Sequence, residues 1–344
     1  MTENRETIAI IRPTEKAGAK TQLLLFFLVA YGVNFVMGLL LWHGSTLSID
    51  TTPFPLAQMF YPAAGVMLAY LVTRRRDDLL PRWFFLCFLL ATAAVLLCAV
   101  FSLFLPFGQS SANGLSMWTM ISQYIGIGGT ILCLITLLQA GKNRRTAYGL
   151  DWKHSKASLL CILLFFLLYL GRAVILYLAA GQAHMLITIL QDSNTTSLLL
   201  TMPLNFCFAF APFFGEEYGW RYYLQPILQK RFGKRSGVLI LGIVWGLWHI
   251  FLDFFYYSTP DKGWFMTLSQ IIGCVTLGIF IAWAYLKTNN IWVPVILHFM
   301  NNNLSFVYAH LTQKQEMTWA LMLISGILFG PFLLSKMFST SSPT

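Results

Sequence analysis

Charged residues are scarce in this chain. Only 10% of its 344 residues are Asp, Glu, Lys or Arg, whereas roughly a quarter are charged in a soluble domain. The composition therefore excludes an ordinary soluble globular protein. Apolar residues replace the missing charge: 57% of the chain is hydrophobic, 16% is aromatic and the mean hydropathy is +0.65. The solvent that suits this composition is a lipid bilayer.

Paired cysteines are also missing. All six cysteines lie in apolar stretches, and none has the Cys-x-x-Cys spacing that is typical of zinc or redox sites. We expect them to be small core-facing or lipid-facing residues. They are Cys87, Cys98, Cys133, Cys161, Cys207 and Cys274.

Long apolar stretches recur along the sequence. A transmembrane helix needs roughly 20 apolar residues, and ten stretches approach that length, which predicts an all-α polytopic membrane helix bundle with about ten transmembrane helices. No small-residue cleavage site follows the first stretch, so we expect a signal anchor. The expected spans are Thr21–Trp42, Pro55–Thr73, Arg82–Pro106, Met117–Ala140, Ala157–Ala180, Ser197–Phe214, Gly237–Tyr256, Phe265–Leu286, Ile291–His310 and Thr318–Met337.

Basic residues outnumber acidic ones, 23 to 13, and their positions predict the orientation of the bundle. Twenty of the 23 fall in every second connection between spans, and Arg172 lies inside a span. Membrane insertion produces this distribution, so no nucleic acid is needed to explain the charge. We predict that both termini are cytoplasmic. We expect a multi-pass integral membrane protein, of the bacterial plasma membrane, that contacts membrane lipid.

Ionisable side chains within or beside the spans concentrate in the second half of the chain. A charge at mid-bilayer costs about 2.5 to 3.5 kcal/mol on insertion scales, so each such residue is a functional hypothesis. Glu216, His249 and His298 lie at similar depths, roughly 16 to 21 Å from the cytoplasmic ends of three helices, at 1.5 Å per residue. We expect any chemistry to belong to residues 200 to 310.

These residue types suit general acid–base chemistry on a water molecule. A glutamate in a low-dielectric cavity can act as a general base towards water, and a neighbouring histidine can orient that water, roles that suit Glu216 and His249. His298 and Asn302 share a helical face and offer N–H donors to a developing oxyanion.

Glu217 and Arg221 also share a helical face, and we expect the arginine to hold this carboxylate charged and leave Glu216 to titrate. A purely structural ion pair is the alternative. For Arg172 we favour structural pairing over anchoring of a substrate carboxyl terminus. Asp253 either orients His249 or faces the outer loop, and we favour the loop.

Three motifs stand in order on these helices: Glu-Glu-x-x-x-Arg at 216–221, aromatic-x-x-x-His at 245–249 and His-x-x-x-Asn at 298–302. Together they resemble the CPBP or Abi family of intramembrane proteases, which includes type II CAAX prenyl endopeptidases and lysostaphin-resistance-A-like proteins. The resemblance covers about residues 200 to 305. Trp245 departs from the Phe of many members. The resemblance implies the catalytic set Glu216, Glu217, Arg221, His249, His298 and Asn302.

The function that we predict is an intramembrane endopeptidase acting on a hydrophobic, lipidated or membrane-embedded peptide. The expected parts are a cytoplasmic tail (1–20), accessory helices (21–196), a catalytic core (197–310) and a last helix with a short tail (311–344). A transporter is disfavoured because the polar residues occupy only one half of the chain. A non-catalytic peptide-binding scaffold or bacteriocin self-immunity protein is the main alternative.

A metal site is a competing interpretation of the same residues. Glutamate and two histidines are adequate Zn²⁺ ligands, and the family is often described as metalloproteases. The His-Glu-x-x-His pattern of soluble zinc proteases is absent, and Asn302 is a better oxyanion donor than zinc ligand. We favour catalysis that requires no metal, with Zn²⁺ as the alternative.

Overall fold

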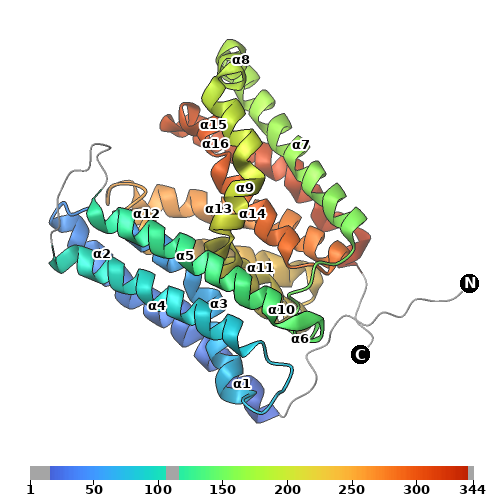
Figure 1. The fold of residues 1–344 in the computed structure, drawn as a ribbon. Coiled ribbons are helices and arrows are strands. Elements are labelled where there is room, and N and C mark those ends of the chain that lie inside the picture. Colours follow the sequence, from blue (N-terminus) through green and yellow to red (C-terminus); the bar gives the residue numbers. More distant parts are fainter. Residues whose placement is uncertain (1–15, 106–115, 340–344) are drawn as a thin grey trace, which may run out of the picture.

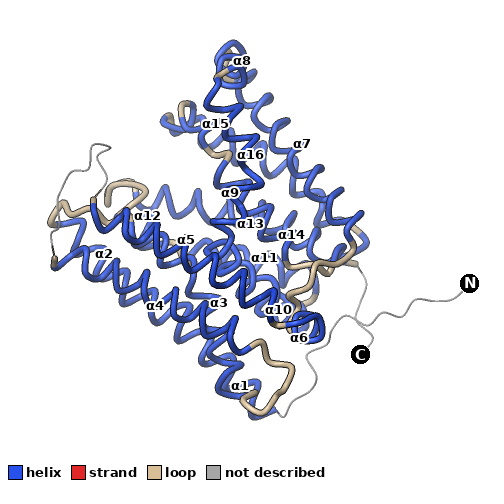
Figure 2. The backbone as a smooth tube through the Cα atoms, viewed as in Figure 1, coloured by secondary structure: helices blue, strands red, loops and turns tan. Residues whose placement is uncertain are grey.

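The computed structural model describes residues 16–105 and 116–339. Helices are the only regular elements within these ranges (Figure 2), and nine of them are long and apolar enough to cross a bilayer. The all-α polytopic membrane bundle is therefore confirmed (Figure 1). Most of the cytoplasmic tail expected at 1–20, the end of the third span at Pro106 and the last residues of the chain lie outside the described ranges.

The first half of the chain contains five of these long helices, close to the expected spans. The first is 29 residues long, Gly18–Thr46, and contains a π-helical turn, η1, between two α-helical parts. A short helix, α6, follows the fourth span. The elements are α1 (Lys16–Phe27), η1 (Leu28–Val33), α2 (Asn34–Thr46), α3 (Pro53–Thr73), α4 (Arg82–Phe104), α5 (Met117–Gln139), α6 (Gly141–Ala147) and α7 (Ser155–Ala179).

The second half begins with a short helix, α8, and then a continuous helix of 40 residues, Ser193–Phe232. Several of the later helices are interrupted. The elements are α8 (Ala183–Gln191), α9 (Ser193–Glu217), η2 (Tyr218–Leu224, π-helical), α10 (Gln225–Phe232), α11 (Lys234–Leu247), α12 (Ile250–Phe255), α13 (Gly263–Thr288), α14 (Trp292–Asn303), α15 (Phe306–Ala309), η3 (Leu311–Gln313), α16 (Gln315–Phe329), η4 (Gly330–Leu334) and η5 (Lys336–Phe338).

Two expected spans differ from the structure. The sixth was expected to end at Phe214 but continues to Phe232, because the polar residues after Phe214 are buried against other helices instead of forming a loop. The ninth, expected at 291–310, is broken into α14 and α15, so no single long helix forms there. At the break, Ser305 donates from both its backbone nitrogen and its hydroxyl to the carbonyl oxygen of Asn302, which competes with helical pairing.

The helices surround α3, α9 and α13, which bring the later motifs together. In Figure 1, α2, α3, α4 and α5 lie side by side, while α7, α8 and the first part of α9 rise beyond them. Helix α3 contacts α1, α4 and α9; α9 also contacts α5 and α14; and α13 contacts α11, α14 and α16. Residues of both halves belong to one packed core. The division of the chain into accessory and catalytic parts stays a prediction.

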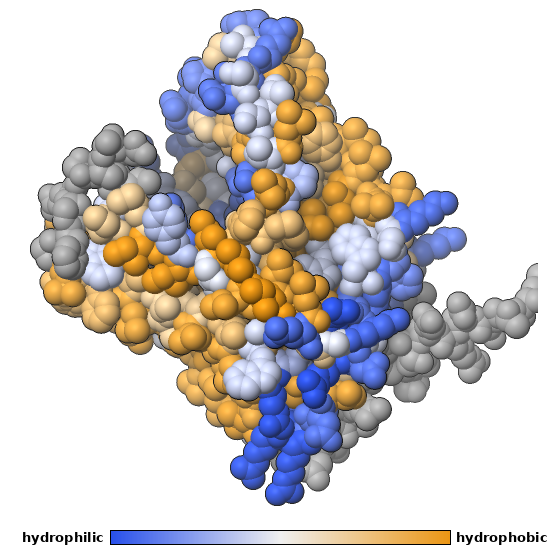
Figure 3. Space-filling model, viewed as in Figure 1, coloured by the Kyte–Doolittle hydropathy of each residue, from blue (hydrophilic) through white to orange (hydrophobic). Residues whose placement is uncertain are grey.

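Hydropathy divides the surface as expected of a membrane protein. Figure 3 shows apolar side chains over much of the visible face, with hydrophilic ones gathered over α6 and the loop that joins α3 to α4, and again around α8. The first of these two groups belongs to the side that the basic residues predict to be cytoplasmic.

Two pairs of glycines set the spacing of the helices that carry the motifs. A Cβ atom on Gly215 or Gly219 would lie 2.3 Å from atoms of α3. A Cβ atom on Gly242 or Gly246 would lie 2.6 or 2.5 Å from backbone atoms of α13. Small residues four apart allow helix backbones to approach closely in lipid, so these glycines hold α9 against α3 and α11 against α13.

Asp50 links the outer ends of two spans. Its carboxylate, in the α2–α3 loop, accepts hydrogen bonds from Thr52 and from the Thr119 hydroxyl (2.6 Å) in the first turn of α5. Partial burial alone would raise the pKa of Asp50, but hydrogen bonds from Ser116, Thr119 and Thr52 outweigh it and lower the pKa to about 2. The link therefore stabilises the fold at neutral pH and is lost only as the pH falls through this low value.

Candidate active site

Glu217 is the most fully paired charge inside the bundle. It ends α9, is completely buried, and receives two donors on its two oxygens. The Nε of Arg221, one turn later, donates to Oε2 at 2.9 Å. The Nδ1 of His298, on α14, donates to Oε1 at 3.0 Å. One carboxylate thus connects η2 to α14.

Glu216 is buried beside it in different surroundings. Its Oε2 accepts a hydrogen bond of 2.6 Å from the indole Nε1 of Trp245, a neutral donor on α11. None of the ion pairs among the described residues includes Glu216. Two adjacent glutamates therefore differ: Glu217 is held by a cation and an imidazole, and Glu216 by an indole.

Trp245 lies at the centre of the motif residues. The guanidinium carbon of Arg221 stands 4.8 Å from the centre of its ring. The rings of Trp245 and His298 are 5.4 Å apart and T-shaped. A phenylalanine would preserve such ring contacts but would lack the N–H that donates to Glu216. The sequence singled out this position as an aromatic wall; the hydrogen bond to Glu216 was not foreseen.

His249 lies in the break between α11 and α12. Its Nδ1 lies 2.9 Å from the carbonyl oxygen of Trp245. Because a carbonyl can only accept, Nδ1 carries the proton in this arrangement, which leaves Nε2 of the neutral ring as an acceptor. The side chain is 7% exposed, so Nε2 is available to a small molecule within the membrane interior.

Residues of the first two spans hold this break in place. The Trp248 carbonyl oxygen, just before His249, accepts from the amides of Asn34 (2.8 Å) and Gln58 (3.0 Å). The Tyr31 hydroxyl donates to the Val244 carbonyl oxygen at 2.9 Å. Sequence reasoning missed these supports, although amides inside apolar spans are a readable signal of interhelical hydrogen bonding.

Asn302 lies apart from the buried group. Its side chain is exposed, and its Oδ1 accepts a hydrogen bond of 3.1 Å from the amide of Asn301. The preceding backbone is tied to α7, because the Tyr169 hydroxyl donates to the Asn301 carbonyl oxygen at 3.4 Å. The structure therefore brings Glu216, Glu217, Arg221 and His298 together around Trp245. It places His249 in the turn between α11 and α12, with its ring centre 6.3 Å from that of Trp245, and it leaves the role of Asn302 a prediction.

Arg172 is held by hydroxyl groups and aromatic rings. Its guanidinium donates to the Tyr308 hydroxyl (3.0 Å) and the Ser325 hydroxyl (3.1 Å), and it stands 4.5 Å from the centre of the Tyr169 ring. No ion pair among the described residues includes it. The structural pairing that we favoured is therefore not made with a carboxylate of the described residues; hydroxyl groups and a cation–π contact hold Arg172 instead and join α7 to α15 and α16.

The position of Asp253 differs from our prediction. We expected it to face the outer loop, but its side chain is completely buried. Its backbone nitrogen donates to the carbonyl oxygen of His249 at 2.9 Å, one turn earlier. The reason is that α12 packs against α13, which covers this helical face.

The candidate zinc ligands of the motif site are not arranged as a metal site. No three His, Cys, Asp or Glu side chains gather as metal ligands within residues 16–105 and 116–339. The Nδ1 atoms of both histidines already have oxygen partners, and Glu217 is occupied by Arg221. The arrangement therefore does not fit Zn²⁺ without movement of these side chains, and no step below uses a metal.

Comparison with known proteins places these motifs in a family. Residues 196–304 match the family described as type II CAAX prenyl endopeptidase Rce1-like. A protein of Methanococcus maripaludis, "CAAX prenyl protease 2", is 32% identical over 106 residues, which are 29% of this chain and 39% of that protein. This chain thus matches well under half the length of its curated relative. No solved structure matches it. The resemblance read from the three motifs is confirmed by this match, which covers the segment that contains all three.

The two glutamates should differ in their effect on stability. Glu217→Gln leaves the buried Arg221 without its charged partner, and we expect it to lower the free energy of unfolding by about 3 to 5 kcal/mol. Glu216→Gln retains an oxygen that can accept from Trp245, and we expect a change below about 1 kcal/mol. Unfolding of both purified variants in the same detergent measures this difference. Equal losses would show that the two carboxylates are not held differently.

Proposed function

We propose that this chain is an intramembrane endopeptidase that hydrolyses a peptide bond of a hydrophobic, lipidated or membrane-embedded substrate. The observation that carries the proposal is the contrast within the glutamate pair. Glu217 is committed to Arg221 and His298, whereas Glu216 has a single neutral donor and is available for proton transfer. The Rce1-like family match supports the same reaction class.

In the proposed mechanism, Glu216 acts as general base. It takes a proton from a water molecule as the water oxygen attacks the carbonyl carbon of the peptide bond, and that proton then passes to the departing amine. His249 accepts a hydrogen bond from the same water through Nε2 and so orients it. Burial of both groups strengthens these interactions because little bulk water screens them.

The remaining motif residues are proposed to stabilise the negative charge that develops on the carbonyl oxygen. Because Nδ1 of His298 already donates to Glu217, Nε2 can donate to the oxyanion only when the ring is the imidazolium, which the adjacent Glu217 carboxylate favours. The amide of Asn302 is proposed as the second donor. Arg221 keeps Glu217 ionised and in place. Glu217 is thus a positioning residue, which acts through His298.

The substrate is proposed to approach from the cytoplasmic side, where the basic connections lie. A type II CAAX prenyl endopeptidase assignment favours cleavage near a lipidated carboxyl terminus, and a transmembrane precursor is compatible with the same site. The bacterial plasma membrane is our proposed location. A non-catalytic scaffold is the second candidate, since peptide binding would need the same buried polar side chains but no transferable proton.

Loss of either proton-handling group should abolish cleavage without unfolding the protein. We expect Glu216→Gln and His249→Ala each to lower the cleavage rate by at least about 100-fold, measured on a membrane peptide substrate with purified protein. Asn303→Ala is the matched control, because the Asn303 amide only bonds the Phe299 carbonyl of its own helix. Full rescue of a deletion strain by Glu216→Gln would instead support the scaffold.

The indole N–H of Trp245 should contribute to catalysis in addition to the packing of its ring. Trp245→Phe retains an aromatic wall but removes the donor to Glu216, and we expect kcat to fall about tenfold with little change in KM. Trp248→Phe is the control, because its indole donates to the Ala30 carbonyl oxygen and not to a motif residue. An unchanged kcat in Trp245→Phe would remove Trp245 from the mechanism.

Metal removal tests the competing zinc mechanism. Because the described donors do not gather around one point, we expect cleavage to persist after prolonged dialysis against a strong chelator. Metal content of the dialysed protein would be measured in parallel. Loss of cleavage that added Zn²⁺ restores would establish the metal-dependent alternative.

A further inference from the structure

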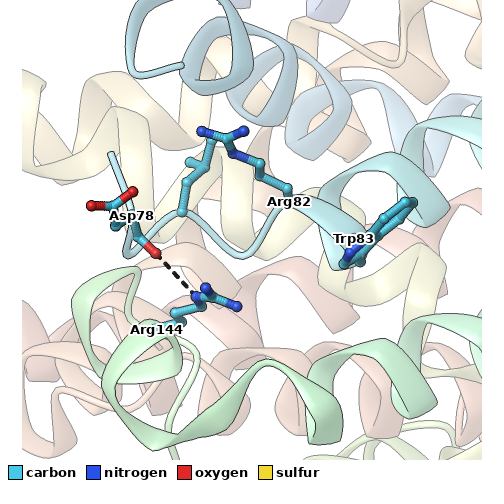
Figure 4. Close-up of a pocket in the computed structure, with 5 residues that line it drawn as sticks. Asp78, Arg82, Trp83 and Arg144 are labelled. Atoms are coloured by element: carbon cyan, nitrogen blue, oxygen red, sulfur yellow. Dashed lines mark hydrogen bonds between the residues drawn. The ribbon is translucent and has the colours of Figure 1, made fainter. Parts of the chain in front are cut away.

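A polar pocket lies away from the motif residues, on the side predicted to be cytoplasmic. Its volume is about 250 Å³, and it is formed where the α3–α4 loop and the start of α4 meet α6 (Figure 4). Its lining residues are Asp78, Leu80, Arg82, Trp83 and Arg144. None of them belongs to the catalytic set, so the proposed peptidase does not account for this pocket.

Two arginines face the pocket with unused donors. The Nε of Arg144 donates to the backbone carbonyl oxygen of Asp78 at 3.0 Å, and Arg82 donates to the carbonyl oxygen of Arg75. These bonds orient the guanidinium groups while other N–H groups on each remain without a partner in the described chain. Neither arginine belongs to an ion pair among the described residues.

The nearby carboxylates do not neutralise this charge. Asp78 lines the pocket, but Figure 4 shows its carboxylate turned away from Arg144, with only its backbone oxygen in contact. Asp77 is occupied elsewhere, because it accepts from the Tyr148 hydroxyl and the Leu79 backbone nitrogen. The first turn of α4 adds to the positive potential, since it has no acidic residue and no side-chain cap.

Apolar surface descends from this pocket along two packed helices. On α4, Trp83 is 73% exposed, and Leu86, Leu90 and Leu97 are exposed on the same helical face. On α5, whose end leads into α6, an exposed row is formed by Ile131, Ile135 and Leu138. A tryptophan at the head of such a face is typical of the level of lipid headgroups.

We propose that this pocket binds the phosphate of an anionic membrane phospholipid, with Arg82 and Arg144 on the headgroup and the acyl chains along α4 and α5. Guanidinium groups suit phosphate because they present paired N–H donors. A free phosphate ion has the same charge chemistry, but it would leave the adjoining apolar faces unused. The occupant that uses both the basic pocket and these faces is a phospholipid.

Native mass spectrometry of the full-length protein in detergent tests this site. Phosphatidylglycerol and phosphatidylcholine of identical acyl chains are the probes, and we expect the wild type to retain phosphatidylglycerol preferentially. Arg82→Gln with Arg144→Gln should reduce its binding roughly 30-fold. The single variant Arg144→Gln, which keeps the Arg82 contact to the loop, should reduce binding about fivefold and guards against misfolding of the double variant.

The matched control removes the same charge elsewhere on the predicted cytoplasmic side. Arg231→Gln with Arg235→Gln changes two exposed arginines near the start of α11, and we expect phosphatidylglycerol binding to stay within about twofold of wild type. Equal losses in both double variants would show diffuse attraction and overturn the pocket. Equal retention of the two lipids, or displacement of phosphatidylglycerol by excess inorganic phosphate, would also overturn the proposal.

Discussion

The ion pair between Glu217 and Arg221 sits inside the helix bundle, where no bulk water is available to solvate either charge. Each charge is therefore stabilised mainly by the other and by its immediate neighbours. Arg221 also stands over Trp245, and Glu217 also accepts from His298, so this one pair connects η2 with α11 and α14. Glu216 is placed by the same contacts, because its indole donor belongs to the ring that Arg221 covers. Chemistry at Glu216 thus depends on a charge pair that does not itself transfer protons.

The first spans take part in this arrangement although they carry none of the three motifs. A broken helix in lipid frees backbone carbonyl groups that must find donors within the protein. At the break before His249, Asn34 and Gln58 supply them; beyond His298, Tyr169 and Tyr177 do so for the carbonyl oxygens of Asn301 and Val307. The accessory helices are in this sense the support of the site, since they fix the irregular backbone at His249 and the backbone that follows the helix of His298.

Much of the fold could be predicted from the sequence because lipid imposes a simple rule: apolar stretches of about 20 residues become helices. That rule fails where polar residues occur within a stretch. It ended the sixth span too early, before Glu216, and it passed over the break between α14 and α15. The same rule cannot show which face of a helix is buried, which is why Asp253 was placed towards the outer loop.

The motif residues themselves could be found from residue type, spacing and depth, since few ionisable groups occur in the later spans. The hydrogen-bond partners of these residues could not be found in this way. The indole that donates to Glu216 and the amides that support Trp248 depend on contacts between helices far apart in sequence, which periodicity does not encode. Asn302 shows the opposite limit, because its helical register with His298 was readable but its exposed side chain was not.

The 40-residue helix that runs from Ser193 to Phe232 carries a mechanical consequence. At 1.5 Å per residue it is about 60 Å long, roughly twice the thickness of the hydrocarbon core. Such a rod meets a bilayer only by leaning, by projecting beyond it or by changing the local membrane thickness. The distance from Glu216 to the aqueous phase is then set partly by the surrounding lipid, so membranes of different thickness present the same carboxylate at different depths.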